Sequence, residues 1–168
     1  MDMKQHGGKL LTKNYSHYYR FLTITFTFVS CLILSSCGYK EKMLKVYKND
    51  ESYCRYFGTI SFFEKETHDN GNFLNFSSVT KIDDNNNEVE VDMRNEFHGN
   101  DFLIYAKNTE KVWNDLNPYI GQEISFVSCP VIFHHGYFPP IVQITYDDVE
   151  ILSFKDGKEA LLESVNKM

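Results

Sequence analysis

The sequence lacks the short motifs that identify the common enzyme classes. It contains no nucleophile elbow, no H-E-x-x-H pair of histidines and no glycine-rich phosphate loop. No spacing of acidic residues and histidines indicates an acid–base pair, and internal repeats are missing. We therefore expect no enzymatic activity and no cofactor.

Basic residues are scarce beyond the first 36 positions. The whole chain has 17 lysines and arginines against 23 acidic residues. Residues 1–36 hold four of the basic residues and one acid, which leaves 13 basic and 22 acidic residues and a net charge of −9. Nucleic-acid affinity comes mainly from lysine and arginine on phosphates, so nucleic-acid binding is not expected.

Long apolar runs are also absent. The segment Phe21–Leu34 is uncharged and mostly apolar over 14 residues, whereas a membrane-spanning helix needs about 20. Four basic residues and one acid precede it: Lys4, Lys9, Lys13, Arg20 and Asp2. A basic segment, an apolar segment and small residues in this order are typical of an export signal.

The end of this segment carries a more specific pattern. Leu34-Ser35-Ser36-Cys37 resembles the lipobox of bacterial lipoproteins, in which an aliphatic residue and two small residues precede the lipidated cysteine. The resemblance implies cleavage after Ser36, a lipid on the sulfur of Cys37 and a stable membrane anchor. Gly38 stands where an aspartate would favour the inner membrane, so we expect the outer membrane, facing the periplasm. An ordinary signal peptide or a buried helix is the alternative.

Two cysteines remain in the body of the chain, Cys54 and Cys129. Export places them in an oxidising compartment, where disulfides persist. We expect a bridge between them, and two separate buried thiols are the alternative.

The remaining 132 residues have the length of one domain. Residues 37–52 are charged and are predicted to form a tether, 53–154 a β domain and 155–168 an amphipathic helix. Hydrophobic alternation and turn residues predict strands at Tyr53–Phe63, Phe73–Ile82, Glu88–Met93, Phe102–Ala106, Glu123–Phe133 and Ile141–Leu152. Gly58 predicts a bend or bulge in the first strand. Asn108 or Thr109 is expected to cap a short helix that ends at Pro118.

Two short segments resemble small bacterial OB-fold proteins. One is Trp113–Phe126, where Leu116 and the pair Gly121-Gln122 lead into an alternating strand; the other is Tyr56–Ile60. The resemblance implies a mainly β fold, a five- to six-stranded OB-like Greek-key barrel with a short helix before strand 4 and a C-terminal helix.

The OB resemblance also bears on the two cysteines. Its first and fourth strands pair antiparallel, and Cys54 lies at the start of one while Cys129 lies late in the other. The pairing therefore brings them within the reach of a disulfide.

Candidate metal ligands are few. A zinc site needs three or four converging ligands, and the candidate histidines are His68, His98, His134 and His135. Adjacent residues on an extended chain point in opposite directions, so His134 and His135 are not expected to share one metal. A calcium-loop-like opening at Asp83, Asn85 and Asn87 fails because Glu88 replaces the required glycine and Arg94 the final glutamate. We expect a solvated turn there and no metal site.

The loop Tyr137-Phe138-Pro139-Pro140 is the candidate ligand-contact loop. In OB folds the loop between strands 4 and 5 frames the ligand face, and aromatic residues beside prolines offer rigid contact area. The alternative is that these aromatics only pack against the end of the barrel.

These features predict a lipid-anchored envelope protein that acts as a non-catalytic binding module. Its partner would be another envelope protein, a glycan or a small ligand. The alternative is an inhibitor or immunity lipoprotein that blocks a toxin or hydrolase, because an acidic surface suits a basic target.

Overall fold

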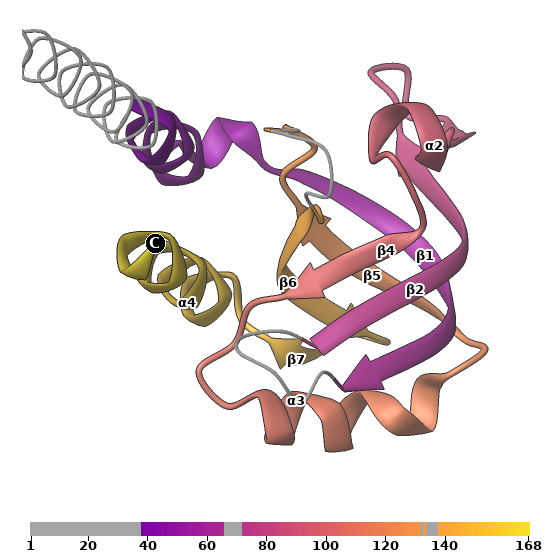
Figure 1. Ribbon diagram of the computed structural model, residues 1–168. Coiled ribbons are helices and arrows are strands. Elements are labelled where there is room, and N and C mark those ends of the chain that lie inside the picture. Colours follow the sequence, from indigo (N-terminus) through magenta and orange to yellow (C-terminus); the bar gives the residue numbers. More distant parts are fainter. Residues whose placement is uncertain (1–37, 66–71, 132, 134–137) are drawn as a thin grey trace, which may run out of the picture. The chain divides into compact units, whose positions relative to one another are not determined.

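The computed structural model describes residues 38–65, 72–131, 133 and 138–168 (Figure 1). The folded domain is the unit Lys42–Met168. Residues 42–48 are helical. They are followed by η1 (Asp50–Ser52), β1 (Cys54–Lys65), β2 (Asn72–Ile82), β3 (Glu88–Glu90), α2 (Met93–Glu96), β4 (Asp101–Ile104), α3 (Thr109–Leu116), η2 (Asn117–Tyr119), β5 (Glu123–Ser128), β6 (Pro140–Tyr146), β7 (Val149–Leu152) and α4 (Phe154–Lys167).

The strands form one mixed sheet of seven strands. β1 pairs antiparallel with β2 and with β5, β5 pairs antiparallel with β6, and β2 pairs antiparallel with β4. β4 and β6 are parallel, while β3 adds to β2 and β7 adds to β6. The prediction of a mainly β domain with a short helix before the strand at Glu123 and a C-terminal helix is confirmed (Figure 1).

Aromatic rings fill the centre of the domain. Tyr56, Phe76, Phe102 and Phe126 are each at most 1% exposed, and the rings of Phe76 and Phe126 stack with centroids 4.5 Å apart. Gly58 lies beside this stack, and a Cβ there would be 2.6 Å from Cδ1 of Phe76. The glycine therefore makes room for the aromatic core, while the register irregularities of β1 follow it, around Ile60.

Helix α3 covers the ends of β1 and β2. Asn108 caps the helix by accepting a hydrogen bond from the backbone N–H of Lys111 at 2.9 Å, which confirms one of the two predicted caps. Trp113 packs on Phe63 of β1 with ring centroids 4.2 Å apart. The amide of Asn72 donates to the carbonyl of Thr109 at 3.2 Å, which ties the first turn to β2.

The predicted tether is not an extended linker in the described residues. Residues 42–48 are helical, Met43 is buried and Tyr47 is fully buried. The hydroxyl of Tyr53 donates to the carbonyl of Tyr47 at 2.9 Å, and Lys158 of α4 contacts Asp50 and donates to the carbonyl of Lys48 at 3.0 Å. Two apolar side chains four residues apart give this charged segment a face that packs against the domain.

Two predicted strands have different bounds in the structure. The strand expected at Glu123–Phe133 ends at Ser128, because its register with β6 is irregular at Val127 and Ser128 and Pro130 follows shortly after. The strand expected at Ile141–Leu152 is two strands, joined by a turn at Asp147 and Asp148 with φ of 44° and 64°. Positive φ at both central residues is typical of a tight hairpin turn.

A short helix replaces the end of the strand predicted at Glu88–Met93. β3 ends at Glu90 and α2 begins at Met93. Asp92 caps this helix, since its side chain accepts hydrogen bonds from the backbone N–H groups of Arg94 and Asn95. This local competition between an aspartate cap and an alternating strand pattern explains the wrong prediction.

Candidate functional site

The face of β1, β2 and β4 that points away from the core carries aromatic side chains around a polar centre. We call this surface the aromatic face and define it by Phe62, Phe73, Asn75, Asp101 and Phe138. Phe62 lies directly opposite Asn75, and Asn75 lies directly opposite Asp101. Directly opposite residues of antiparallel strands share one face of a sheet, as do residues two apart on one strand.

The loop before β6 reaches the aromatic face. The ring of Phe138 meets the ring of Phe73 edge to face, with centroids 4.6 Å apart. The backbone N–H of Leu103 donates to the carbonyl of Pro139 at 3.0 Å, and Pro140 begins β6. The structure thus brings Phe138 of the predicted contact loop onto this face, whereas Pro139 and Pro140 are buried and Tyr137 lies outside the described residues.

Exposure separates this face from the core. Phe62 is 47% exposed and Phe138 is 37% exposed, although both are large apolar side chains. Exposed aromatic rings grouped on one surface are a feature of interaction sites.

Hydrogen bonds hold the polar centre of the aromatic face in one arrangement. The amide of Asn75 donates to Oδ1 of Asp101 at 2.6 Å. The hydroxyl of Ser61 donates to the carbonyl of Asn75 at 3.0 Å and also contacts the side-chain oxygen of Asn75. A carboxylate and an amide are therefore fixed between the aromatic rings, where they could orient a ligand's polar groups.

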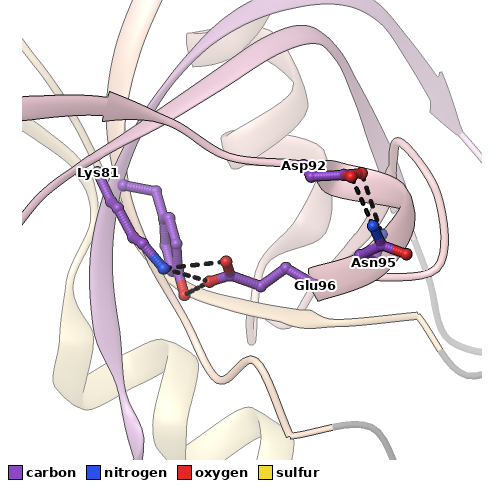
Figure 2. Close-up of polar contacts among 5 residues, drawn as sticks. Lys81, Asp92, Asn95 and Glu96 are labelled. Atoms are coloured by element: carbon purple, nitrogen blue, oxygen red, sulfur yellow. Dashed lines mark hydrogen bonds and ion pairs between the residues drawn. The ribbon is translucent and has the colours of Figure 1, made fainter.

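A second group of polar side chains, which we call the polar cluster, joins β1, β2 and α2: Tyr56, Lys81 and Glu96. The Tyr56 hydroxyl donates to Oε1 of Glu96 at 3.0 Å, and the ammonium of Lys81 lies 2.9 and 3.2 Å from the two carboxylate oxygens. Figure 2 shows Lys81 and Glu96 directed at each other and the Asp92–Asn95 contact of the α2 cap beside them.

Burial and neighbouring groups raise the pKa of Tyr56 well above its ordinary value. Burial contributes most, followed by the charges of Cys54 and Glu96 and by side-chain hydrogen bonds with both residues. Tyr56 therefore stays protonated at neutral pH and acts as a hydrogen-bond donor.

Both cysteines of the domain are free thiols in the structure, so the predicted bridge is not formed. The predicted antiparallel pairing of their strands is confirmed, but its register places Cys54 opposite Ser128 rather than Cys129. Cys129 is one residue further along, and neighbouring residues of an extended chain point to opposite faces.

The predicted turn at Asp83 has a local explanation. The carboxylate of Asp83 accepts hydrogen bonds from the backbone N–H groups of Asn87 at 2.8 Å and Asn85 at 2.9 Å, and Asn86 has a φ of 66°. The hydrogen bonds, that from the Asn87 backbone first, lower the pKa of Asp83. The carboxylate of Asp83 thus stabilises the turn through hydrogen bonds to the turn's own backbone.

The other predicted candidates are only partly described. His68, His134 and His135 lie outside the described residues, as do the lipobox residues Leu34 to Cys37, whereas His98 is exposed with a φ of 61°. Within the described part of the chain, no three histidine, cysteine or acidic side chains come together as metal ligands. No helix in that part is both long and apolar enough to cross a membrane.

The sequence did not reveal Lys81, Glu96, Asn75 and Asp101 as site residues. Asn75 and Lys81 lie on β2, Asp101 on β4 and Glu96 on α2, and only the tertiary structure brings Asn75 to Asp101 and Lys81 to Glu96. Comparisons with protein-family models, with curated proteins and with solved structures find no match to this chain.

Proposed function

We propose that this chain is a lipid-anchored protein of the bacterial outer membrane, facing the periplasm, and that its β domain is a non-catalytic binding module. The anchor rests on the lipobox-like Leu34-Ser35-Ser36-Cys37 after a basic and an apolar segment. A lipid on Cys37 would hold the domain at the membrane surface, because two or more buried acyl chains bind a bilayer stably.

We further propose that the domain is an OB-like barrel. The pairings support this, because β1, β2, β4, β6 and β5 each pair with two others of this set and return to β1. The parallel contact between β4 and β6, and a helix between β4 and β5, are also typical of the OB fold. In this interpretation β3 and β7 are extra strands that pair with β2 and β6 and do not belong to the five-stranded barrel.

The aromatic face is the binding surface that we propose, and one observation carries the proposal. The contact of Phe138 with Phe73 attaches the loop before β6 to the exposed face of β1, β2 and β4. OB folds bind ligands on the corresponding strands and loops. The partner is another envelope protein, a glycan or a small ligand that meets rings and a fixed amide–carboxylate pair.

Substitution of the two exposed rings tests this proposal. We expect the double variant Phe62→Ala and Phe138→Ala to lose about tenfold or more in affinity, because exposed aromatic anchors commonly contribute more than 1 kcal/mol each. Partners would be identified by affinity capture of the full-length, detergent-solubilised protein and then measured by titration. Val149→Ala is the control, since Val149 is 60% exposed on β7. Equal affinities of the double variant and the native protein would contradict the proposal.

An inhibitor or immunity lipoprotein is the second candidate function. The excess of acidic over basic residues beyond the leader favours a basic target. This function predicts a stoichiometric complex with one enzyme and loss of that enzyme's activity in the complex. A glycan or small-molecule partner would exclude it.

A further inference from the structure

The helical segment that precedes η1 has two opposite faces. Met43 and Tyr47 are buried, whereas the exposed side chains include those of Lys42, Lys45 and Lys48. Lys45 lies two residues from both buried side chains, and two residues correspond to about 200° of rotation around a helix. Lys42 and Lys48 lie three residues to either side of Lys45 and therefore share its face. We call these three lysines the basic face.

The charge of the basic face is not neutralised within the described part of the chain. Lysines elsewhere pair with carboxylates, among them Lys81, Lys107, Lys111 and Lys158. No ion pair among the described residues involves a lysine of the basic face, and no acidic residue stands between the first and the last of them in the sequence. Three ammonium groups are therefore available to an anionic partner.

The charge of the chain changes sign immediately after this segment. Residues 40–48 hold four lysines and one glutamate, a net charge of +3. Residues 49–168 hold 9 basic and 21 acidic residues, a net charge of −12. An anionic surface attracts the first group and repels the second, so this distribution favours one orientation of the domain toward such a surface.

The basic face also lies close in sequence to the proposed lipid anchor. Lys42 follows Cys37 by five positions, and five residues of fully extended chain span at most about 18 Å. A lipid on Cys37 would therefore keep the basic face within that distance of the lipidated residue. Because the two attachments belong to one chain, the anchor raises the effective concentration of the lysines at the membrane surface.

We propose that the basic face docks on the anionic phospholipid headgroups of the membrane that holds Cys37. The inference rests on the proposed anchor and adds an orientation to it. Each lysine is attracted to the negative surface potential of a membrane, and this attraction decays within a Debye length of about 8 Å at physiological ionic strength.

The contacts of the helical segment carry this orientation to the rest of the domain. The hydroxyl of Tyr53 donates to the carbonyl of Tyr47 at 2.9 Å, and the ammonium of Lys158 on α4 donates to the carbonyl of Lys48 at 3.0 Å. Together with the burial of Met43 and Tyr47, these bonds attach the segment to the domain. Docking of the basic face therefore orients the β domain instead of leaving it on a free linker.

Lysine footprinting of the full-length protein on vesicles tests the proposal. The protein purified from membranes is placed in vesicles of phosphatidylcholine alone or of phosphatidylcholine and phosphatidylglycerol in equal parts. A brief reaction with an amine-acetylating reagent and peptide mass mapping then give the rate at each lysine. We expect Lys42, Lys45 and Lys48 to react about threefold or more slowly in the anionic vesicles. Lys111, whose side chain is 64% exposed on α3, should react equally in both.

A charge-matched pair of variants separates the basic face from net charge. Lys45→Glu should raise the reactivity of Lys42 and Lys48 in the anionic vesicles to the level of the neutral ones. Arg94→Glu makes the same change of charge at an exposed position of α2 and should leave the protection intact. About 1 M salt, where the Debye length is roughly 3 Å, should abolish the protection in the native protein.

Three results would overturn the proposal: equal rates in the two kinds of vesicle, equal slowing of Lys111, or protection that persists in about 1 M salt. The intact mass of the same sample shows separately whether Cys37 carries a lipid. A lipidated chain with unprotected lysines would contradict only the docking. An unlipidated chain would contradict the anchor, and its footprint on added vesicles would still decide whether the basic face binds them.

Discussion

At the residue scale, the two cysteines of the domain have contrasting environments despite their adjacent register positions. Cys54 is exposed at the start of β1, whereas Cys129 is 0% exposed after the end of β5. Burial, the largest cause, raises the pKa of the Cys129 thiol. Since the thiolate is the reactive form, both access and protonation protect Cys129.

We therefore predict that a maleimide labels Cys54 in the folded, reduced protein and labels Cys129 only after unfolding. Mass mapping after a short exposure, with and without urea, measures both sites. Protection of both thiols in protein that has not been treated with a reductant, but not after reduction, would mean that they are bridged in solution. Such a result would restore the disulfide predicted from the sequence.

A second prediction concerns Asp83. Backbone and side-chain hydrogen bonds from Asn87 and Asn85 lower its pKa below the ordinary value of 3.8. A carboxyl group with a lower pKa in the folded state stabilises the fold above its unfolded pKa, and this contribution is lost as the pH falls through the folded pKa. We expect a carboxyl-carbon NMR titration to place the Asp83 midpoint lower in the folded protein than in urea. Equal midpoints would show that the turn does not hold the carboxylate.

At the scale of elements, α3 and α4 each begin next to a side chain that accepts a hydrogen bond from a backbone N–H group of the first turn. Asn108 caps α3, and Ser153 caps α4 by accepting a hydrogen bond from the backbone N–H of Asp156 at 3.1 Å. The cap of α3 was predicted from the sequence, and α4 begins at Phe154, one residue before the predicted start of the C-terminal helix at residue 155. Strand ends were harder to predict. The sequence predicted one strand at Ile141–Leu152, whereas the structure has a turn at Asp147 and Asp148 that divides it into β6 and β7.

The contact between α4 and β6 leads to a third prediction. Gly157 is buried in α4, and a Cβ at this position would lie 2.1 Å from the carbonyl oxygen of Val142. We expect Gly157→Ala to destabilise the domain by about 2 kcal/mol, as overpacking does, even though alanine favours helix by about 1 kcal/mol. Urea unfolding measures the change.

The control for this helix is Glu163→Ala, because Glu163 is an exposed residue of α4. It should change the free energy of unfolding by no more than about 0.5 kcal/mol. A Gly157→Ala variant as stable as the native protein would mean that α4 does not approach β6 as closely as the structure has it.

At the scale of the whole molecule, the proposed anchor determines where the domain works. Replacement of Cys37 by alanine removes the only sulfur that the lipobox-like pattern offers for lipidation. We expect the variant to leave the membrane fraction or to retain its leader, as judged by fractionation and intact mass. Native fractionation and mass in the variant would contradict the lipoprotein proposal.

The sequence by itself determined those features that depend on neighbours along the chain. Alternation, turn residues and caps were enough to predict a mainly β domain, most of its strands and the helix at Thr109–Leu116. The short OB-like segments added the antiparallel pairing of the strands that carry Cys54 and Cys129.

Only the tertiary structure decided which side chains meet. A one-residue difference in register puts Ser128, not Cys129, opposite Cys54, because neighbouring residues of a strand point to opposite faces. The tertiary structure likewise brings Phe138, in the loop before β6, to Phe73, and Glu96, on α2, to Tyr56; these pairs are 65 and 40 positions apart in the sequence. Such contacts depend on how strands, loops and helices are placed in the whole domain, which no short stretch of sequence specifies.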